Sequence, residues 1–554
     1  MLWLAGFPAL RQFNVTWDEA LGDLFYGERY FSYFTSFDAK YLDFATDVYP
    51  PERQPSLYSS PFKGRPWEYY PVANTLAAAT SELLARRLGW LDVFDGFHAV
   101  NLLLAALLIF FMFREVSRRD GVTAALAAIV LLFTAPRVFC DLMANIKDFP
   151  LLVFFTLSVL LFFRAFESGT RRGLLVAAVV VGLAIGTKGN ALFFPAIPLL
   201  LWLFGGTPPA WKGRRKQLLA TGALAALAAL AVLFAAWPYM WTDTGPRLKD
   251  HVTYISMRAA YLDTAALDSG RVVTREESAA PAIEAVLLTT PPVFLLAALA
   301  GALLALRQAI KTRDRWAILL LVWPLVVFAR YLLPGAINFD GVRHFLELFP
   351  PLAILAGRAI AALARALAQK AGDAGAFRRA LPAAAVALLL LPGALVTWLS
   401  HPFEVTYWNA FAGGFKGARA ENLPQVGDYW GMSYRLGLEW LWQNAEPNAY
   451  LAVPVVEHAV RLVAPLRLRP DLQLLPVSRP TSPVISTERL EGTRDLARQG
   501  APVYVMFVER RDWMNQLMID CLTYLEPIAV WTYQGEPVLS IYRYRPPPPR
   551  LLGP

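Results

Sequence analysis

The sequence is poor in charged residues and in cysteine. Asp, Glu, Lys and Arg make up 17% of its 554 residues, whereas a soluble domain averages about a quarter. Its two cysteines, Cys140 and Cys521, are too few for a disulfide scaffold, and no Cys/His cluster has the spacing of metal ligands. We expect two unpaired thiols, with a disulfide between them as the less favoured alternative. This scarcity excludes a disulfide-rich or zinc-ribbon protein.

Apolar residues are correspondingly abundant in the sequence. They make up 56% of the chain and gather in blocks approaching ~20 residues, the length of a helix that crosses ~30 Å of hydrocarbon. The first block is too short to span, so either the native chain begins upstream of Met1 or this segment enters the bilayer at a shallow angle. The pattern predicts a polytopic α-helical membrane protein of about eleven transmembrane helices. The blocks are 2–10, 97–113, 122–135, 149–166, 174–186, 191–204, 218–237, 292–306, 316–333, 345–362 and 381–399.

Basic residues gather in alternate loops between these blocks. The loops are 114–119, 164–172, 212–216, 307–315 and 365–379. All five lie on one side of the membrane if every block spans, and the positive-inside rule makes that side cytoplasmic. The net charge of +9 therefore indicates topology rather than a nucleic-acid surface. We expect a multi-pass protein of the inner (plasma) membrane, with the long loops 14–96 and 238–291 and everything after Ser400 outside the cytoplasm.

After Ser400 the pattern becomes that of a soluble domain. Apolar periodicity predicts helices at 436–443 and 457–463. Runs of β-branched and aromatic residues predict strands at 450–456, 472–477, 503–508, 529–533 and 537–544. We therefore divide the chain into a transmembrane module, residues 1–400, and a small extracytoplasmic α/β domain, residues 401–554. The proline-rich tail is predicted to be disordered.

The strongest candidate for chemistry is the pair Asp18-Glu19, just outside the first apolar block. Group transfer to a hydroxyl needs a carboxylate that accepts the hydroxyl proton. A lipid-phosphate donor presents its reacting group at the water interface, where this pair lies. A helix start explains the same residues without catalysis, since Thr16 is a good N-cap and acidic residues are favoured in a first turn. Both interpretations can hold together.

Two further outer segments combine cations with a carboxylate. Lys147 and Asp148 precede the fourth block. A lysine suits phosphate as a point charge, but ordinary polarity ahead of a helix explains the pair equally well. Arg343 and His344 precede the tenth block, where helix amides and a guanidinium form an anion site. Anchoring to lipid head groups is the alternative there.

Lys188 and Arg65 are two more outward cations and candidate phosphate ligands. A structural role is the simpler interpretation for each. No cofactor is indicated with certainty, and no set of residues stands out as metal ligands. A two-carboxylate site is nevertheless compatible with a divalent metal ion.

The order and sidedness of these motifs resemble glycosyltransferase family 39 of the C-type (GT-C) superfamily, which includes protein O-mannosyltransferases and lipid A aminoarabinose transferases. The first outer loop begins with Asp-Glu, the second ends in Lys-Asp-x-Pro, and a late segment, 340–344, reads Asp-Gly-x-Arg-His. Residues 401–431, with His-Pro-Phe, Tyr-Trp-Asn, Gly-Gly and Asp-Tyr-Trp-Gly, are similar to a bacterial subgroup of that family. The chain departs from the family at 69–72, Tyr-Tyr-Pro-Val, where relatives often carry Lys or His before two prolines.

The resemblance implies an inverting transfer of a single hexose or pentose from a polyprenyl-phosphate donor to a hydroxyl of a protein, lipid or glycan. It implies Asp18 as the base and Asp148 as the second acidic residue. Membrane lipids are the other expected partners, and no nucleic acid is expected. A transporter or flippase of lipid-linked sugars is the main alternative, but transporters place ionisable groups near the bilayer midplane. A non-catalytic surface protein leaves Asp18, Asp148 and Arg343 on one face unexplained.

Overall fold

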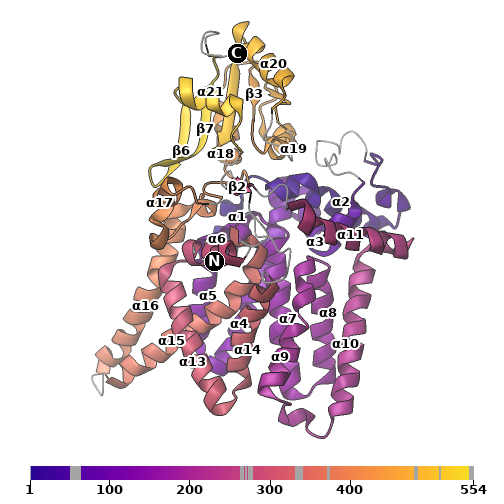
Figure 1. The fold of residues 1–554 in the computed structure, drawn as a ribbon, viewed down its shortest axis with the longest axis vertical. Helices are drawn as coiled ribbons and strands as arrows, with labels where there is room; N and C mark the ends of the chain where they lie inside the picture. Colours follow the sequence, from indigo (N-terminus) through magenta and orange to yellow (C-terminus); the bar gives the residue numbers. More distant parts are fainter. Residues whose placement is uncertain are drawn as a thin grey trace.

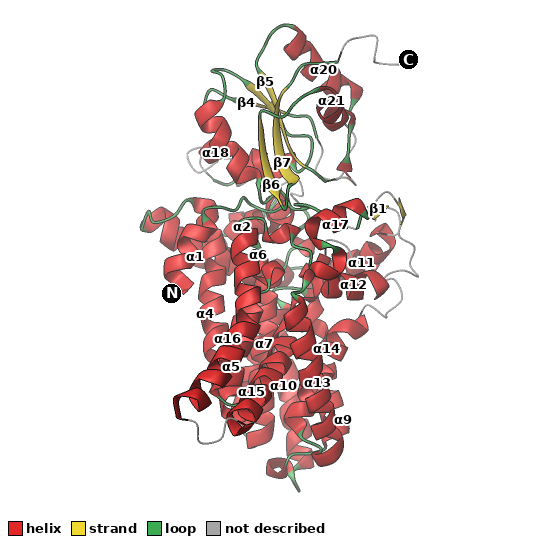
Figure 2. Cartoon of the chain, turned by 90° about the vertical axis from the view of Figure 1, so that its left-hand side faces the viewer, coloured by secondary structure: helices red, strands yellow, loops and turns green. Residues whose placement is uncertain are grey.

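The computed structural model describes residues 2–49, 64–262, 267–268, 271–272, 279–330, 341–370, 375–423, 425–478, 485–510 and 513–547. Figure 1 shows a long helical bundle with a small sheet domain at one end, and Figure 2 shows the same two parts from the side. The predicted fold class is confirmed. Asp340 and most of the tail predicted to be disordered, residues 548–554, lie outside the described residues.

Each of the eleven apolar blocks is helical over most of its described residues. Among the described residues, six helices are long and apolar enough to cross a membrane, or up to seven if the bent pair α5 and α6 (Pro136–Ala144) forms one span. Three others, α8, α9 and α14, are shorter, so a count of eleven spans stays a prediction. The helices are α1 (Leu2–Leu10), α4 (Val93–Asp120), α5 (Val122–Phe133), α7 (Asp148–Ser168), α8 (Arg171–Ile185), α9 (Ala196–Gly205), α10 (Arg215–Ala236), α13 (Pro292–Thr312), α14 (Arg315–Ala329), α15 (Phe349–Lys370) and α16 (Gly375–Ser400).

The bend between α5 and α6 has a local cause. The two helices meet at 69°. Ala135, the residue before Pro136, has extended backbone angles of φ −81° and ψ 116°, because proline disfavours the helical conformation in the residue ahead of it. The bend carries α6 across the end of the bundle nearest the sheet domain and delivers the chain to the start of α7.

Short helices cover the end of the bundle that carries the sheet domain. They are a π-helical turn η1 (Glu19–Asp23), α2 (Leu24–Ser36), α3 (Pro71–Ser81), α11 (Thr244–Leu262) and α12 (Ala279–Thr289). Figure 1 places α2, α3 and α11 together beneath the domain. The helices α2 and α3 cross closely because Gly27 has no side chain; a Cβ there would lie 2.4 Å from the Asn74 carbonyl oxygen. This crossing brings the first outer loop against the ends of the long helices.

The C-terminal domain contains a five-stranded sheet in the order β4-β3-β5-β7-β6. The strands β4 (Gln473–Leu475), β3 (Tyr450–Ala452) and β5 (Val503–Val508) are parallel, and β7 (Glu536–Arg543) and β6 (Ala529–Tyr533) continue antiparallel. All five predicted strands are confirmed. The predicted helices correspond to α18 (Tyr434–Asn444) and α19 (Glu457–Arg467), whereas α17 (Gly414–Ala420), α20 (Thr487–Arg498) and α21 (Gln516–Tyr524) were not predicted. Strand β5 is buried throughout, as expected at the centre of a covered sheet.

The domain is seated on residues 14–18 of the first outer loop. The Trp17 ring lies edge-on to Trp513 at 4.6 Å and to His458 at 5.2 Å between ring centroids. The Trp17 amide donates to the Trp430 carbonyl at 3.2 Å. At the other side of the contact, Arg467 Nη2 lies 2.7 Å from Asp92. The domain is therefore held directly beside Asp18.

Both cysteines are free and buried, which confirms the expectation of two unpaired thiols. Cys140 contacts the Met432 sulfur at 3.4 Å, and Cys521 lies in α21 of the sheet domain.

The orientation in the membrane stays a prediction with a direct test. A reporter enzyme that is active only outside the cytoplasm, fused after Ser400, should be active, because five basic loops place that point opposite the cytoplasm. The matched fusion in the basic loop 212–216 should be inactive. Activity of the loop fusion and silence of the Ser400 fusion would invert the topology.

Candidate active site

Four of the expected site residues meet at the start of α7. Lys147 Nζ lies 3.3 Å from Asp18 Oδ2, and Arg343 Nη1 lies 3.0 Å from the same oxygen. Arg343 Nη1 also lies 3.2 Å from Asp148 Oδ2. One guanidinium nitrogen thus bridges two carboxylates, one just before η1 and the other at the start of α7.

The turn after α8 adds a third cation. Lys188 Nζ forms an ion pair with Asp148 Oδ1 and lies 3.0 Å from His344 Nδ1. The Asn190 side chain donates to the His344 carbonyl at 3.0 Å. Lys188 and His344 were predicted as candidates in two different segments of the sequence. In the structure they belong to the same site as Arg343.

A third carboxylate, Asp23, was not expected. Asp23 Oδ2 lies 3.1 Å from Lys147 Nζ, and the Asn74 amide donates to Asp23 Oδ1 at 3.2 Å. In an α-helix, residues five apart point in different directions, but η1 is π-helical, and its wider turn, with i→i+5 hydrogen bonds, brings residues five apart nearer to one face. Asp18 and Asp23 consequently face the same lysine. We call Asp18, Asp23, Lys147, Asp148, Lys188 and Arg343 the charged cluster.

Asn145 fixes the geometry of the α7 start. Its Oδ1 accepts from the amides of Lys147 at 3.0 Å and Asp148 at 2.8 Å. Its Nδ2 donates to Asp148 Oδ2 at 3.0 Å. These bonds satisfy amides at the helix start and hold the two functional side chains in place.

Glu19 turns away from the charged cluster. Its carboxylate accepts from the Thr16 amide at 2.7 Å, from the Ile146 amide at 3.3 Å and lies 3.2 Å from His98 Nε2. The bond back to Thr16 is one half of a capping box, so the helix-start interpretation applies to Glu19. The bond to Ile146 ties the first outer loop to the start of α7. These contacts suit a positioning residue rather than a group that meets substrate.

The structure does not bring Arg65 into this arrangement. Its side chain is half exposed and pairs with Glu68 at 3.4 Å, while its backbone amide donates to the Tyr26 hydroxyl at 3.0 Å. The ion pair with Glu68 holds the Arg65 guanidinium close to its own segment of the chain.

The sheet domain supplies an aromatic residue. The Arg343 guanidinium lies 4.7 Å from the centroid of the Trp430 ring. The Asp428 carboxylate accepts from the amides of Trp430, Gly431 and Ser433 at 3.0, 2.8 and 2.7 Å. Gly431 has φ +76°, a conformation that favours glycine. The Asp-Tyr-Trp-Gly motif thus builds the turn that holds Trp430 over Arg343.

Burial distinguishes the members of the charged cluster. The side chains of Asp23, Asp148 and Arg343 are at most 2% exposed, whereas Asp18 is 23% exposed and Lys147 22%. Burial raises the pKa of Asp23, and Lys147 partly opposes this rise. Burial lowers the pKa of Lys147, but Asp18 and Asp23 outweigh it and leave that pKa above its usual value. Asp18 is therefore the carboxylate that an incoming substrate can reach.

In the described part of the chain, no group of three or more His, Cys, Asp and Glu side chains converges as a metal-ligand set. The space between Asp18 and Asp148 is occupied by Arg343.

Residues 92–239 match the family model described as dolichyl-phosphate-mannose-protein mannosyltransferase. The fold matches that of ArnT from Cupriavidus metallidurans, solved with bound undecaprenyl phosphate, at a TM-score of 0.51 and 15% identity over 98% of this chain and 96% of ArnT. The resemblance to glycosyltransferase family 39 is confirmed. The chain has the GT-C fold.

A second solved structure, the apo oligosaccharyltransferase of Archaeoglobus fulgidus, is more distant. It gives a TM-score of 0.46 at 13% identity over 88% of this chain and 66% of its own. No curated protein sequence matches the chain significantly. The matched range includes Lys147, Asp148 and Lys188 of the charged cluster.

Proposed function

We propose that this GT-C transferase moves one sugar, with inversion, from a polyprenyl-phosphate donor to an acceptor hydroxyl at the membrane face that carries the sheet domain. The observation that carries the proposal is the position of Asp18. It is the exposed carboxylate of the charged cluster and is held by two cations, Lys147 and Arg343. A base beside phosphate-binding cations is what a single displacement at the anomeric carbon requires.

In the proposed reaction the acceptor oxygen attacks the anomeric carbon while the bond from that carbon to the phosphate oxygen breaks. The bonding electrons leave with the phosphate, and the acceptor proton passes to Asp18. A carboxylate is a weak base at neutral pH. It suffices because the acceptor oxygen becomes acidic only as its bond to the sugar forms.

The leaving phosphate is stabilised by Lys147, Lys188 and Arg343. These three cations are already paired with Asp18, Asp23 and Asp148, which favours their charged forms when no donor is bound. On donor binding, Lys147 and Arg343 exchange part of their contact with Asp18 for the phosphate. Asp18 is then free to accept the proton.

The position of the charged cluster favours a transferase over a flippase. The cluster residues lie at the ends of the helices nearest the sheet domain, where Arg343 contacts the Trp430 ring, and the long helices are apolar. A flippase needs polar groups along its path through the membrane.

The proposal is tested by mass spectrometry of lipid-linked sugars and glycans in a deletion strain. Loss of the gene should remove one sugar from an acceptor and cause the polyprenyl-phosphate sugar to accumulate. The wild-type gene should restore the acceptor, and a gene encoding Asp18→Asn should not. An unchanged glycan and lipid profile in the deletion strain would contradict the proposal.

Donor binding should weaken as the pH rises through about 8. Burial lowers the pKa of Lys188 to about 8, although Asp148 opposes the shift. Lys188 is therefore charged below that pH and neutral above it, whereas the phosphodiester of the donor keeps its charge. The KM for the donor, measured from about pH 6.5 to 9.5, should rise several-fold across this window. The variant Lys188→Arg should abolish the rise, because arginine stays charged; the same rise in both proteins would assign it to another group.

A further inference from the structure

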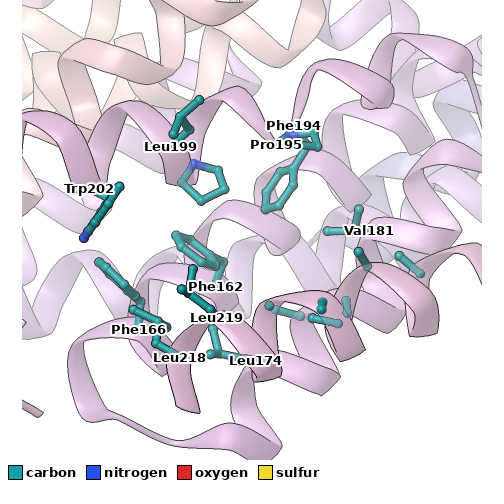
Figure 3. Close-up of a pocket in the computed structure, with 18 of the residues that line it drawn as sticks. Phe162, Phe166, Leu174, Val181, Phe194, Pro195, Leu199, Trp202, Leu218 and Leu219 are labelled. Atoms are coloured by element: carbon teal, nitrogen blue, oxygen red, sulfur yellow. The ribbon is translucent and has the colours of Figure 1, made fainter. Parts of the chain in front are cut away.

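An apolar groove runs between α7, α8, α9 and α10 (Figure 3). Its cavity volume is about 620 Å³. The groove exists because the face of α10 that it meets carries small residues, Gly222, Ala223, Ala225, Ala226 and Ala229, opposite the rings of Phe162, Phe166 and Phe194. Small side chains on one helix and large ones on its neighbours leave a channel between them.

The length of the groove suits an acyl chain. The α10 residues that line it extend from Arg215 to Leu230, which at 1.5 Å per residue is about 22 Å. One leaflet of a ~30 Å hydrocarbon core is about 15 Å deep. A chain that enters at the Arg215 end therefore finds an apolar path through its whole leaflet.

One end of the groove is positively charged. Arg215 is the one charged residue among those that line it, and its guanidinium lies 5.5 Å from the centroid of the Trp202 ring. Lys212, Arg214 and Lys216 are its neighbours, and all four cations are exposed. The groove thus combines an apolar channel with a cationic mouth at the end of the bundle away from the sheet domain.

Some cations at that end of the bundle are paired with carboxylates. Arg315 pairs with Glu167 at 2.6 Å, and Arg119 pairs with Glu115 at 3.4 Å. Within the ranges that the structure describes, no carboxylate forms an ion pair with the four cations from Lys212 to Lys216. Their charge is available to an anion in the membrane interface.

We propose that this groove binds an acidic phospholipid from the leaflet opposite the sheet domain. One acyl chain lies along α10, and the phosphate group lies at Arg215 beside Arg214. Basic pockets between transmembrane helices recognise acidic head groups in this way, and each cation near the surface adds to the affinity. A zwitterionic lipid gains less, because its amine offsets its phosphate.

The test uses the full chain, purified in detergent, delipidated and titrated by native mass spectrometry with phosphatidylglycerol or phosphatidylcholine of the same acyl chains. Phosphatidylglycerol should bind about tenfold more tightly. The double variant Arg214→Gln/Arg215→Gln should lower its affinity about tenfold, to the level of phosphatidylcholine. The control Arg307→Gln/Lys311→Gln, which removes two exposed cations of α13 outside the groove, should bind like wild type.

A second pair of variants tests the channel itself. Gly222 lines the groove, and a Cβ there meets no atom within 4 Å, so Gly222→Phe should fold and fill the channel. Leu227 is 64% exposed and does not line the groove, so Leu227→Phe is the matched control. Gly222→Phe should lose phosphatidylglycerol binding and Leu227→Phe should keep it, with equal thermal midpoints.

Three results would overturn the proposal. They are equal affinity for the two phospholipids, loss of binding in both control variants, and displacement of phosphatidylglycerol by a polyprenyl phosphate with the same sensitivity to Gly222→Phe. The last result would assign the groove to the donor chain instead.

Discussion

The variant Asp18→Asn should lose about 10²–10⁴-fold in turnover, the usual contribution of a general base. Asparagine keeps the size of the side chain and can still accept from Lys147 and Arg343, but it cannot take a proton. Donor affinity should therefore stay within a few-fold of wild type. Turnover is measured by sugar transfer from a synthetic polyprenyl-phosphate sugar, and affinity by direct titration with that donor.

Asp23→Asn is the matched control. Asp23 contacts the same lysine at a similar distance, but its side chain is buried and an acceptor cannot reach it. It should lose less than tenfold in turnover, or about 1.4 kcal/mol. If Asp18→Asn keeps more than about a tenth of wild-type activity, Asp18 is not the base. Equal losses in the two variants would show that only the charge around Lys147 matters.

Replacing Arg343 with alanine should weaken donor binding and turnover together. A hydrogen bond to a charged group contributes about 1.5–3 kcal/mol, so donor affinity should fall about 10–100-fold. Turnover should fall further, because the departing phosphate loses a preorganised cation. The donor affinity and turnover of Arg343→Lys should lie between those of the wild type and Arg343→Ala. Lysine keeps the charge but cannot bridge Asp18 and Asp148 while stacking on Trp430.

Removal of a buried ion-pair partner also destabilises a protein by about 3–5 kcal/mol, so stability needs its own control. Arg358 is buried, lies on α15 and is 3.1 Å from Asp120. Arg358→Ala should lower the thermal midpoint in detergent and leave donor affinity unchanged. If Arg343→Ala behaves in the same way, Arg343 supports the fold and does not bind the donor.

Some residues of the charged cluster could be predicted from the sequence and others could not. Lys147, Asp148 and Arg343 are conspicuous because a charged residue next to an apolar block invites a reason, and these three do meet. Asp23 was overlooked because its position on an ordinary helix points away from Asp18, and only the π-helical turn realigns it. Glu19 was grouped with its neighbour Asp18, yet adjacent residues on a helix point about 100° apart, and it faces His98 instead.

The sequence alone determined the membrane character, the segments that form helices, the change to a soluble domain after Ser400 and the five strands of that domain. These properties depend on local composition and periodicity, which do not depend on how distant segments pack together. Only the tertiary structure decided that Asp18 and Asp148 share one guanidinium nitrogen of Arg343 and that Trp430 stacks on that guanidinium. It alone also showed that small residues of α10 leave a groove. Such contacts depend on the directions of side chains from segments hundreds of residues apart, and these directions are set by how the helices pack.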